Sequence, residues 1–225
     1  MRGLLFLIAI CGLTAAAPPP ASAMQPRVAE ERGAIVHYDA AGSRRVLTSG
    51  RYVQPELSPD GKTAVFIKEE VAGDPGFDTA RTSVWLVDIA SGKPRLLLAS
   101  TPGGAATAKL AAMWKPQFSL NGGFVYVMAE AWVTSSAIHQ INVTTGAHRY
   151  VTDGALLFVI RQGRYAGYLM VQKHVYPKDT ESGAIDPVFV IRPDGGESFM
   201  VPGSDKDDGE HSVEAWMRRQ GRARR

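Results

Sequence analysis

Few residues in this sequence have both the type and the spacing that catalysis requires. No Gly-x-Ser-x-Gly segment occurs, so the strained turn that exposes the serine nucleophile of α/β-hydrolases is missing. The single cysteine, Cys11, stands in an apolar N-terminal segment, and no glycine-rich phosphate loop leads from a strand-like run into a helix-like one. We therefore predict no catalytic residue and no cofactor.

The histidines and acidic residues also lack the spacing of metal ligands. No two histidines are spaced as His-x-x-x-His, and His139 lies on a predicted strand, where we interpret it as a sheet-face residue. In the acidic segment DKDDGE, counting from Asp205 puts Gly209 fifth and Trp216 twelfth. A calcium-binding EF-hand loop needs glycine sixth and glutamate twelfth. We predict no metal site, with an irregular calcium site in this solvated loop as the alternative.

Binding chemistry is better represented, in three long segments that combine aromatic and charged residues. These segments are 71–82, 100–114 and 177–186, and aromatic rings beside charges suit a protein or glycan contact. The candidate binding residues in and near them are Phe77, Asp78, Arg81, Trp114, Trp132, Tyr176, Lys178 and Asp179. The alternative for Trp114 and Trp132 is a core role, because tryptophan is largely buried on average.

A recurring turn motif predicts the strands that would position these residues. PELSPDG (55–61) is echoed by PQFSLNG (116–122), and each is followed by an alternating apolar run. Asp-Gly and Asn-Gly tolerate positive φ and therefore suit tight hairpin turns. A weaker third copy spans 158–176, with Gly163 at the turn. The motif predicts hairpins with Gly61 and Gly122 at their tips.

A second motif alternates with the first and sets a period. VWLVDIASGKPRLL (84–97) matches the segments at 34–47, 138–151 and 188–201, each reading as strand, glycine-containing turn, strand. The turn glycines Gly42, Gly92, Gly146 and Gly195 are spaced 50, 54 and 49 residues apart. A period near fifty with four short strands is typical of β-propeller blades.

SPDGKTAVFI followed by VWLVDIASGKPRLL resembles the repeat of TolB-type β-propellers, and also that of the propeller domain of prolyl-oligopeptidase-type serine peptidases. The resemblance covers residues 34 to about 202. It implies an all-β, TolB-like propeller-type array, which the fourteen predicted strands would build as about three and a half four-stranded blades, followed by a short C-terminal helix. It also implies envelope proteins as candidate partners.

In such an array successive connections alternate between two faces, so the three long segments share one rim. Long connections on one rim of a rigid scaffold are where binding residues are usually found. Because propellers close with more blades than are predicted here, we expect an open or irregular array, or closure through a second copy of the chain as a homodimer that covers the open edges.

The two ends of the chain differ from the repeats. Arg2, the apolar run GLLFLIAICGL and the small residues Ala21-Ser22-Ala23 predict a signal peptide over 1–23; a retained anchor is the alternative. We further predict a linker over 24–33, the propeller-like domain over 34–204, and an acidic loop, short helix and basic tail over 205–225. The helix is expected over 213–220, capped by Ser212 and ended by Gly221, with Val213, Trp216 and Met217 on one face.

Composition completes the functional hypothesis. The 225 residues are 45% hydrophobic and 21% charged, with a formal net charge of +3, which is too balanced to favour nucleic acid. We predict an exported, periplasmic or secreted protein that is not integral to the membrane after cleavage. It would be a non-catalytic binding or scaffold protein for an envelope protein or glycan. The alternative is a propeller-type enzyme, or a regulatory remnant of a peptidase without its hydrolase domain, using His174 with Asp179 or Glu181.

Overall fold

The computed structural model describes residues 24–71, 81–101, 103–177, 183–196, 198–206 and 209–222. These residues form four antiparallel sheets and one helix. The strands are β1 (Arg27–Glu31), β2 (Ala34–Tyr38), β3 (Arg44–Ser49), β4 (Tyr52–Leu57), β5 (Thr63–Val71), β6 (Arg81–Asp88), β7 (Pro94–Leu98), β8 (Ala111–Phe118), β9 (Phe124–Glu130), β10 (Ser136–Asn142), β11 (His148–Asp153), β12 (Ala155–Val159), β13 (Leu169–Gln172), β14 (Val188–Ile191) and β15 (Ser198–Met200), and the helix is α1 (Gly209–Arg222). The predicted signal peptide lies outside the described residues.

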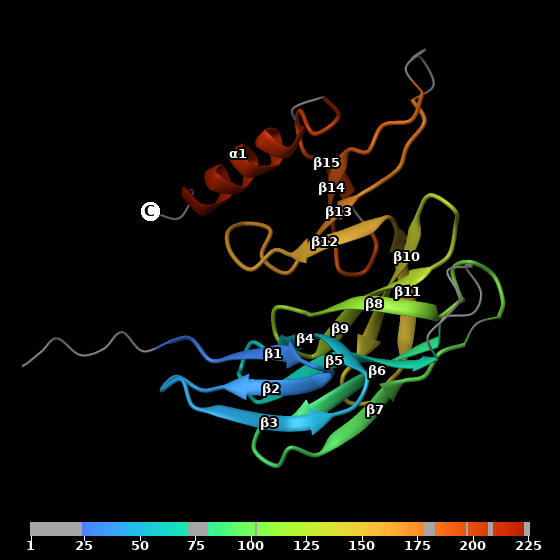
Figure 1. The fold of residues 1–225 in the computed structure, drawn as a ribbon. Coiled ribbons are helices and arrows are strands. Elements are labelled where there is room, and N and C mark those ends of the chain that lie inside the picture. The colour runs from blue at the N-terminus through green and yellow to red at the C-terminus, as the bar shows by residue number, and fades with distance from the viewer. Residues whose placement is uncertain are drawn as a thin grey trace, which may run out of the picture.

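The sheets follow one another in chain order, and each is a run of sequential strands (Figure 1). The first contains β1 to β3, and the others contain four strands each, β4 to β7, β8 to β11 and β12 to β15. The all-β, blade-by-blade prediction is therefore confirmed. The structure adds one strand, β1, within residues 24–33, which the sequence analysis assigned to a linker. In the described part of the chain, no helix is long and apolar enough to cross a membrane.

Hydrophobic side chains fill the space between each pair of successive sheets. The three interfaces are represented by Ile35 with Phe66, by Leu86 with Val127, and by Tyr126 with Leu169. No hydrophobic cluster of the described residues joins the first sheet to the fourth. The core is therefore a series of layers between neighbouring sheets, in which each sheet depends on the next for burial.

The two predicted turns fold in the same way. Gly61 and Gly122 both have φ of +72° and donate their amides to Ser58 and Ser119, respectively. The Ser58 hydroxyl donates to Asp60 and accepts from the Thr63 amide. In the second copy, Ser119 makes the equivalent bonds with Asn121 and Phe124. The serine and the Asx residue of the motif thus close the turn by local hydrogen bonds.

A second set of repeated contacts joins neighbouring sheets. The guanidinium groups of Arg45, Arg95 and Arg149 each donate to backbone carbonyls in the last turn of the following sheet, at Ala90, at Val143, and at Pro193 and Asp194. Each arginine stands three residues after a turn glycine of the fifty-residue motif. In the fourth sheet that position is Ser198. The arginine at this position therefore joins each of the first three sheets to the sheet that follows it.

Helix α1 covers the outer face of the fourth sheet (Figure 1). Trp216 is 5% exposed and lies with Val213 and Met217 against that sheet, as predicted. The predicted helix bounds are wrong, because α1 begins at Gly209 and continues through Gly221 to Arg222. Glu210 in the first turn favours the earlier start through the helix dipole, and one glycine near a helix end costs only about 1 kcal/mol.

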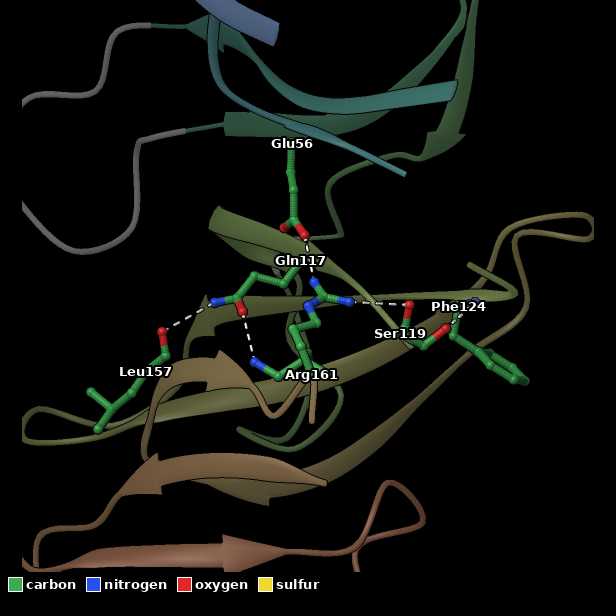
Figure 2. A network of polar contacts seen from close by, with 7 residues as sticks. Glu56, Gln117, Ser119, Phe124, Leu157 and Arg161 are labelled. Carbon is green, nitrogen blue, oxygen red and sulfur yellow. Dashed lines mark hydrogen bonds and ion pairs between the residues drawn. The ribbon is translucent and has the colours of Figure 1, made fainter. Parts of the chain in front are cut away.

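A polar network ties together the first strands of the last three sheets (Figure 2). Gln117 of β8 donates to the Leu157 carbonyl and accepts from the Val159 amide of β12. Arg161 donates to Glu56 of β4 at 2.7 Å and to the Ser119 carbonyl at 3.4 Å. Burial raises the pKa of Glu56 to about 7 despite its pairing with Arg161. This network fixes the position of the fourth sheet against the second and third.

His139 is a buried titratable group of the core, and it gives the fold a pH dependence. It is 1% exposed on β10, and its cross-strand neighbour Val127 belongs to the cluster between the second and third sheets. Neither ring nitrogen has a hydrogen-bond partner in the described part of the chain. Burial, together with the charge of His148, lowers the pKa of His139 to about 4, below the value near 6.5 of an unfolded chain.

Between pH 6.5 and 4 the unfolded chain therefore binds a proton that the folded chain excludes. We expect the free energy of unfolding to fall across this window as the pH falls, by on the order of 2 kcal/mol from His139. Glu56, whose folded pKa is raised, contributes a slope of the opposite sign between its unfolded value and about 7. Comparing urea titrations of the parent and His139→Phe at several pH values cancels the Glu56 contribution. Equal slopes for both proteins would contradict the assignment.

Candidate binding pocket at the long-connection rim

One pocket, of about 350 Å³, lies where the third and fourth sheets meet at the rim of the long connections. Its walls come from β8, the β9–β10 connection and the β11–β12 junction. The remaining wall is formed where β13 ends and just before β14 begins. The third sheet contributes Trp114, Glu130, Trp132 and Ser135, and the fourth contributes Gln172, His174 and Asp186. The pocket is therefore formed by packing between two repeats.

The aromatic walls are Trp114 and Trp132. Trp114 stands on β8 and is half-buried, and it packs on the cluster between the third and fourth sheets while also lining the pocket. Trp132 is 40% exposed in the β9–β10 connection, whose turn is closed by a bond from the Trp132 amide to the Ser135 carbonyl. A core role therefore explains the buried part of the Trp114 side chain. It does not explain why the ring of Trp132 is exposed.

The polar wall is built on the extended β13–β14 hairpin. Val175 and Ile185 exchange two backbone hydrogen bonds, which places His174 directly opposite Asp186 in the same register. His174 Nδ1 lies 2.8 Å from Asp186 Oδ1, and Nε2 lies 3.2 Å from the Tyr176 hydroxyl. Because side chains alternate along a strand, Gln172, His174 and Tyr176 share one face.

The pocket also contains a buried hydroxyl. Ser135 Oγ has no hydrogen-bond partner in the described ranges and is shielded from solvent. Outside the lining, the side chain of Lys173 pairs with Asp153 at 2.9 Å. Burial is the largest single influence on Asp153 and raises its pKa, but the hydrogen bond and the charge of Lys173, together with smaller hydrogen-bond contributions, keep the pKa of Asp153 below its usual value. An unpartnered buried hydroxyl is costly, so Ser135 lowers the stability of this part of the fold.

The structure places the predicted site residues unevenly. Trp114 and Trp132 meet in the pocket, and Tyr176, which is 71% exposed, contacts His174 at its edge. Arg81 begins β6 and does not line this pocket. Phe77, Asp78, Lys178 and Asp179 lie outside the described residues, as does Glu181.

Sequence reasoning missed Glu130, Gln172 and Asp186, and it paired His174 with other carboxylates. One signal for Asp186 was present. The strand-like runs on both sides of the 177–186 segment form a hairpin, and continuing their antiparallel register from the strands outward sets His174 across from Asp186. The sequence contained no comparable signal for Glu130, which is brought in by the packing of the third sheet on the fourth.

The pocket contains one histidine–carboxylate pair, His174 with Asp186. A histidine held by a carboxylate is the arrangement of a general base, but the second ring nitrogen of His174 faces Tyr176. No serine, threonine or cysteine of the described residues has a hydrogen bond to that histidine, whereas an activated nucleophile requires one. The described residues also contain no group of three or more histidine, cysteine, aspartate or glutamate residues placed to hold a metal ion.

Known proteins resemble this chain in fold but not in sequence. No family model and no curated protein sequence matches the chain. Among solved structures, TolB from Acinetobacter baumannii matches 78% of this chain with a TM-score of 0.50 and 15% identity. The tricorn protease matches 77% with a TM-score of 0.53 and 13% identity, and dipeptidyl peptidase 4 from Porphyromonas gingivalis matches 80% with a TM-score of 0.52 and 10% identity.

The chain spans 40%, 15% and 31% of the length of these three proteins, respectively. At such low identity the likeness concerns the fold alone. It confirms the resemblance inferred from the repeats: the described sheets are blades of a β-propeller of the TolB-like kind, shared with propeller domains of prolyl-oligopeptidase-type peptidases.

Proposed function

We propose that this chain is an exported, non-catalytic binding or scaffold protein that engages an envelope protein or glycan through its long-connection rim. The observation that carries the proposal is the convergence of Trp114 and Trp132 with polar side chains of the next repeat in one pocket. Exposed aromatic rings beside fixed polar groups are typical of recognition sites. The N-terminal Arg2, apolar run and Ala21-Ser22-Ala23 support export, and the periplasm is the compartment we propose.

The binding role also agrees with how the pocket is built. Its two walls belong to successive blades that are tied together by the Gln117 and Arg161 network and by a shared hydrophobic cluster. A site on two braced sheets keeps its geometry without a ligand, so less conformational entropy is lost on binding. We also propose a homodimer that closes the array or covers its open sheet edges.

The second candidate is a propeller-type enzyme, favoured by the His174–Asp186 pair. A carboxylate bonded to Nδ1 orients an imidazole for general-base chemistry, and Asp186 supplies this carboxylate in place of the predicted Asp179 or Glu181. Turnover would require Nε2 to leave Tyr176 and face a substrate. Loss of a catalytic rate in His174→Ala with substrate affinity unchanged would favour this candidate over binding.

The proposal is tested by capture from envelope extract with the immobilised chain. We expect the double variant Trp132→Ala, Tyr176→Ala to reduce capture of the recovered partner by about tenfold, the effect of losing 1.4 kcal/mol of binding free energy. Both side chains are exposed, so the fold should be retained.

The matched control replaces exposed residues of the opposite rim. Lys62 and Arg164 lie in or beside the short turns there, and Lys62→Ala, Arg164→Ala should capture the partner as the parent does. If the control variant loses the partner while the long-connection variant keeps it, with melting temperatures equal to that of the parent, the binding face has been assigned to the wrong rim.

A further inference from the structure

The residues that line the pocket at the long-connection rim indicate which chemical class of ligand it would bind. Beyond the two tryptophans, Val133 and Ala155 are the only aliphatic side chains that the described residues contribute, and the other described lining residues apart from Gly154 are polar. An apolar peptide side chain needs an aliphatic wall to gain from burial, and this pocket provides little. Its size, at the low end of the range for small-molecule sites, suits a compact polar ligand.

We infer that the pocket is a saccharide subsite, in which a sugar ring lies against Trp132 and its hydroxyls bond to Gln172 and Asp186. The C–H groups on one face of a sugar ring carry partial positive charge and are attracted to the negative face of an indole. Trp132 offers this face because it is 40% exposed at the mouth. The inference rests on the proposed function, since it names the ligand class of the same rim.

The polar groups match the needs of sugar hydroxyls. Each hydroxyl is both a donor and an acceptor, so a sugar site needs acceptors and donors together. Asp186 accepts from His174 through Oδ1 and has further acceptor capacity in a carboxylate that is 58% exposed. The Gln172 amide donates to the Asp186 carbonyl and also lines the pocket.

Charge refines the class to neutral sugars. Glu130 and Asp186 both line the pocket, and among the residues that the structure describes no lysine or arginine does. A uronic acid or other anionic sugar would bring a third carboxylate close to these two, and the repulsion between like charges costs binding free energy. We therefore expect neutral sugars, including N-acetylated amino sugars, to bind and acidic sugars to be rejected.

The test is isothermal titration of the purified chain with three probes: N,N′,N″-triacetylchitotriose, maltotriose and tri-galacturonic acid. We expect at least one neutral trisaccharide to bind with a Kd of about 1 mM or tighter, and tri-galacturonic acid to bind at least about tenfold more weakly. Trp132→Ala should raise the Kd of the neutral trisaccharide about tenfold, while Lys62→Ala should leave that Kd unchanged. Asp186→Asn keeps the shape of the side chain and removes its charge. This variant should therefore show a smaller difference in Kd between the neutral and the acidic trisaccharides than the parent does.

The outcomes separate this inference from the proposed function. If no neutral probe binds the parent at about 10 mM while envelope capture still depends on Trp132 and Tyr176, the saccharide inference is overturned, and the partner is a protein. If the acidic probe binds the parent as well as the neutral ones do, the charge argument is wrong and the inference falls with it. If capture itself is independent of the rim, both the proposed function and this inference fail.

Discussion

Trp216→Ala is expected to lower the free energy of unfolding by about 3–5 kcal/mol, the usual cost of removing a buried tryptophan. The ring is 5% exposed between α1 and the fourth sheet. It stacks on Tyr165 at 5.5 Å between ring centroids and lies 6.1 Å from Phe199. Its removal leaves a cavity and loosens the only helix that the structure describes, which otherwise shields Met170 and Val190 from water. Urea denaturation followed by circular dichroism measures the loss.

The matched control lies on the same helix. Arg218 is exposed and pairs only weakly with Glu214, four residues earlier, at 3.4 Å, so Arg218→Ala should change the stability by no more than a few tenths of a kcal/mol. Hydrogen exchange adds a local readout, because amides of α1 should lose protection in Trp216→Ala before those of β9 and β10. Similar midpoints for the two variants would show that α1 does not stabilise the fourth sheet.

The second large effect is expected at Gly195, in the turn between β14 and β15. Its φ is +78°, and an added Cβ would lie 2.3 Å from the Val151 carbonyl oxygen of β11. A positive φ costs about 1–3 kcal/mol in any residue other than glycine. The contact of the added Cβ with the Val151 oxygen would also push the turn away from the preceding sheet, to which Arg149 binds it. We expect Gly195→Ala to destabilise the protein by about 3 kcal/mol or more in a thermal or urea titration.

Gly61→Ala separates backbone strain from this clash. Gly61 has φ of +72°, and a Cβ there would meet nothing within 4 Å, so only the conformational cost of about 1 kcal/mol applies. The close approach of Gly195 recurs at Gly146, whose Cβ would lie 2.8 Å from the Leu97 carbonyl oxygen. Equal losses for Gly195→Ala and Gly61→Ala would mean that the turn can move off the preceding sheet at little cost.

The sequence by itself determined the features that depend on neighbours along the chain. The Ser-x-Asp/Asn-Gly turns, the blade period and the apolar face of the C-terminal helix were predicted correctly, because turn closure at Gly61 and side-chain alternation are properties of a few consecutive residues. The helix bounds were missed because a glycine at 221 lowers helix propensity without forbidding it. Strand β1 was missed because RVAEE, which carries three charges, has little hydrophobic alternation.

The tertiary structure alone decided which residues from different repeats meet. Glu130 enters the pocket because the third sheet packs on the fourth, and Arg161 reaches Glu56 across 105 residues of sequence. The arginine clasps at Arg45, Arg95 and Arg149 repeat in the sequence, but their partners are backbone carbonyls, which no residue type reveals. Such contacts depend on how twisted sheets stack, and stacking is set by the fit of whole faces. For this reason the repeat predicted the blades, and only their packing brought Trp114, Trp132, His174 and Asp186 into one site.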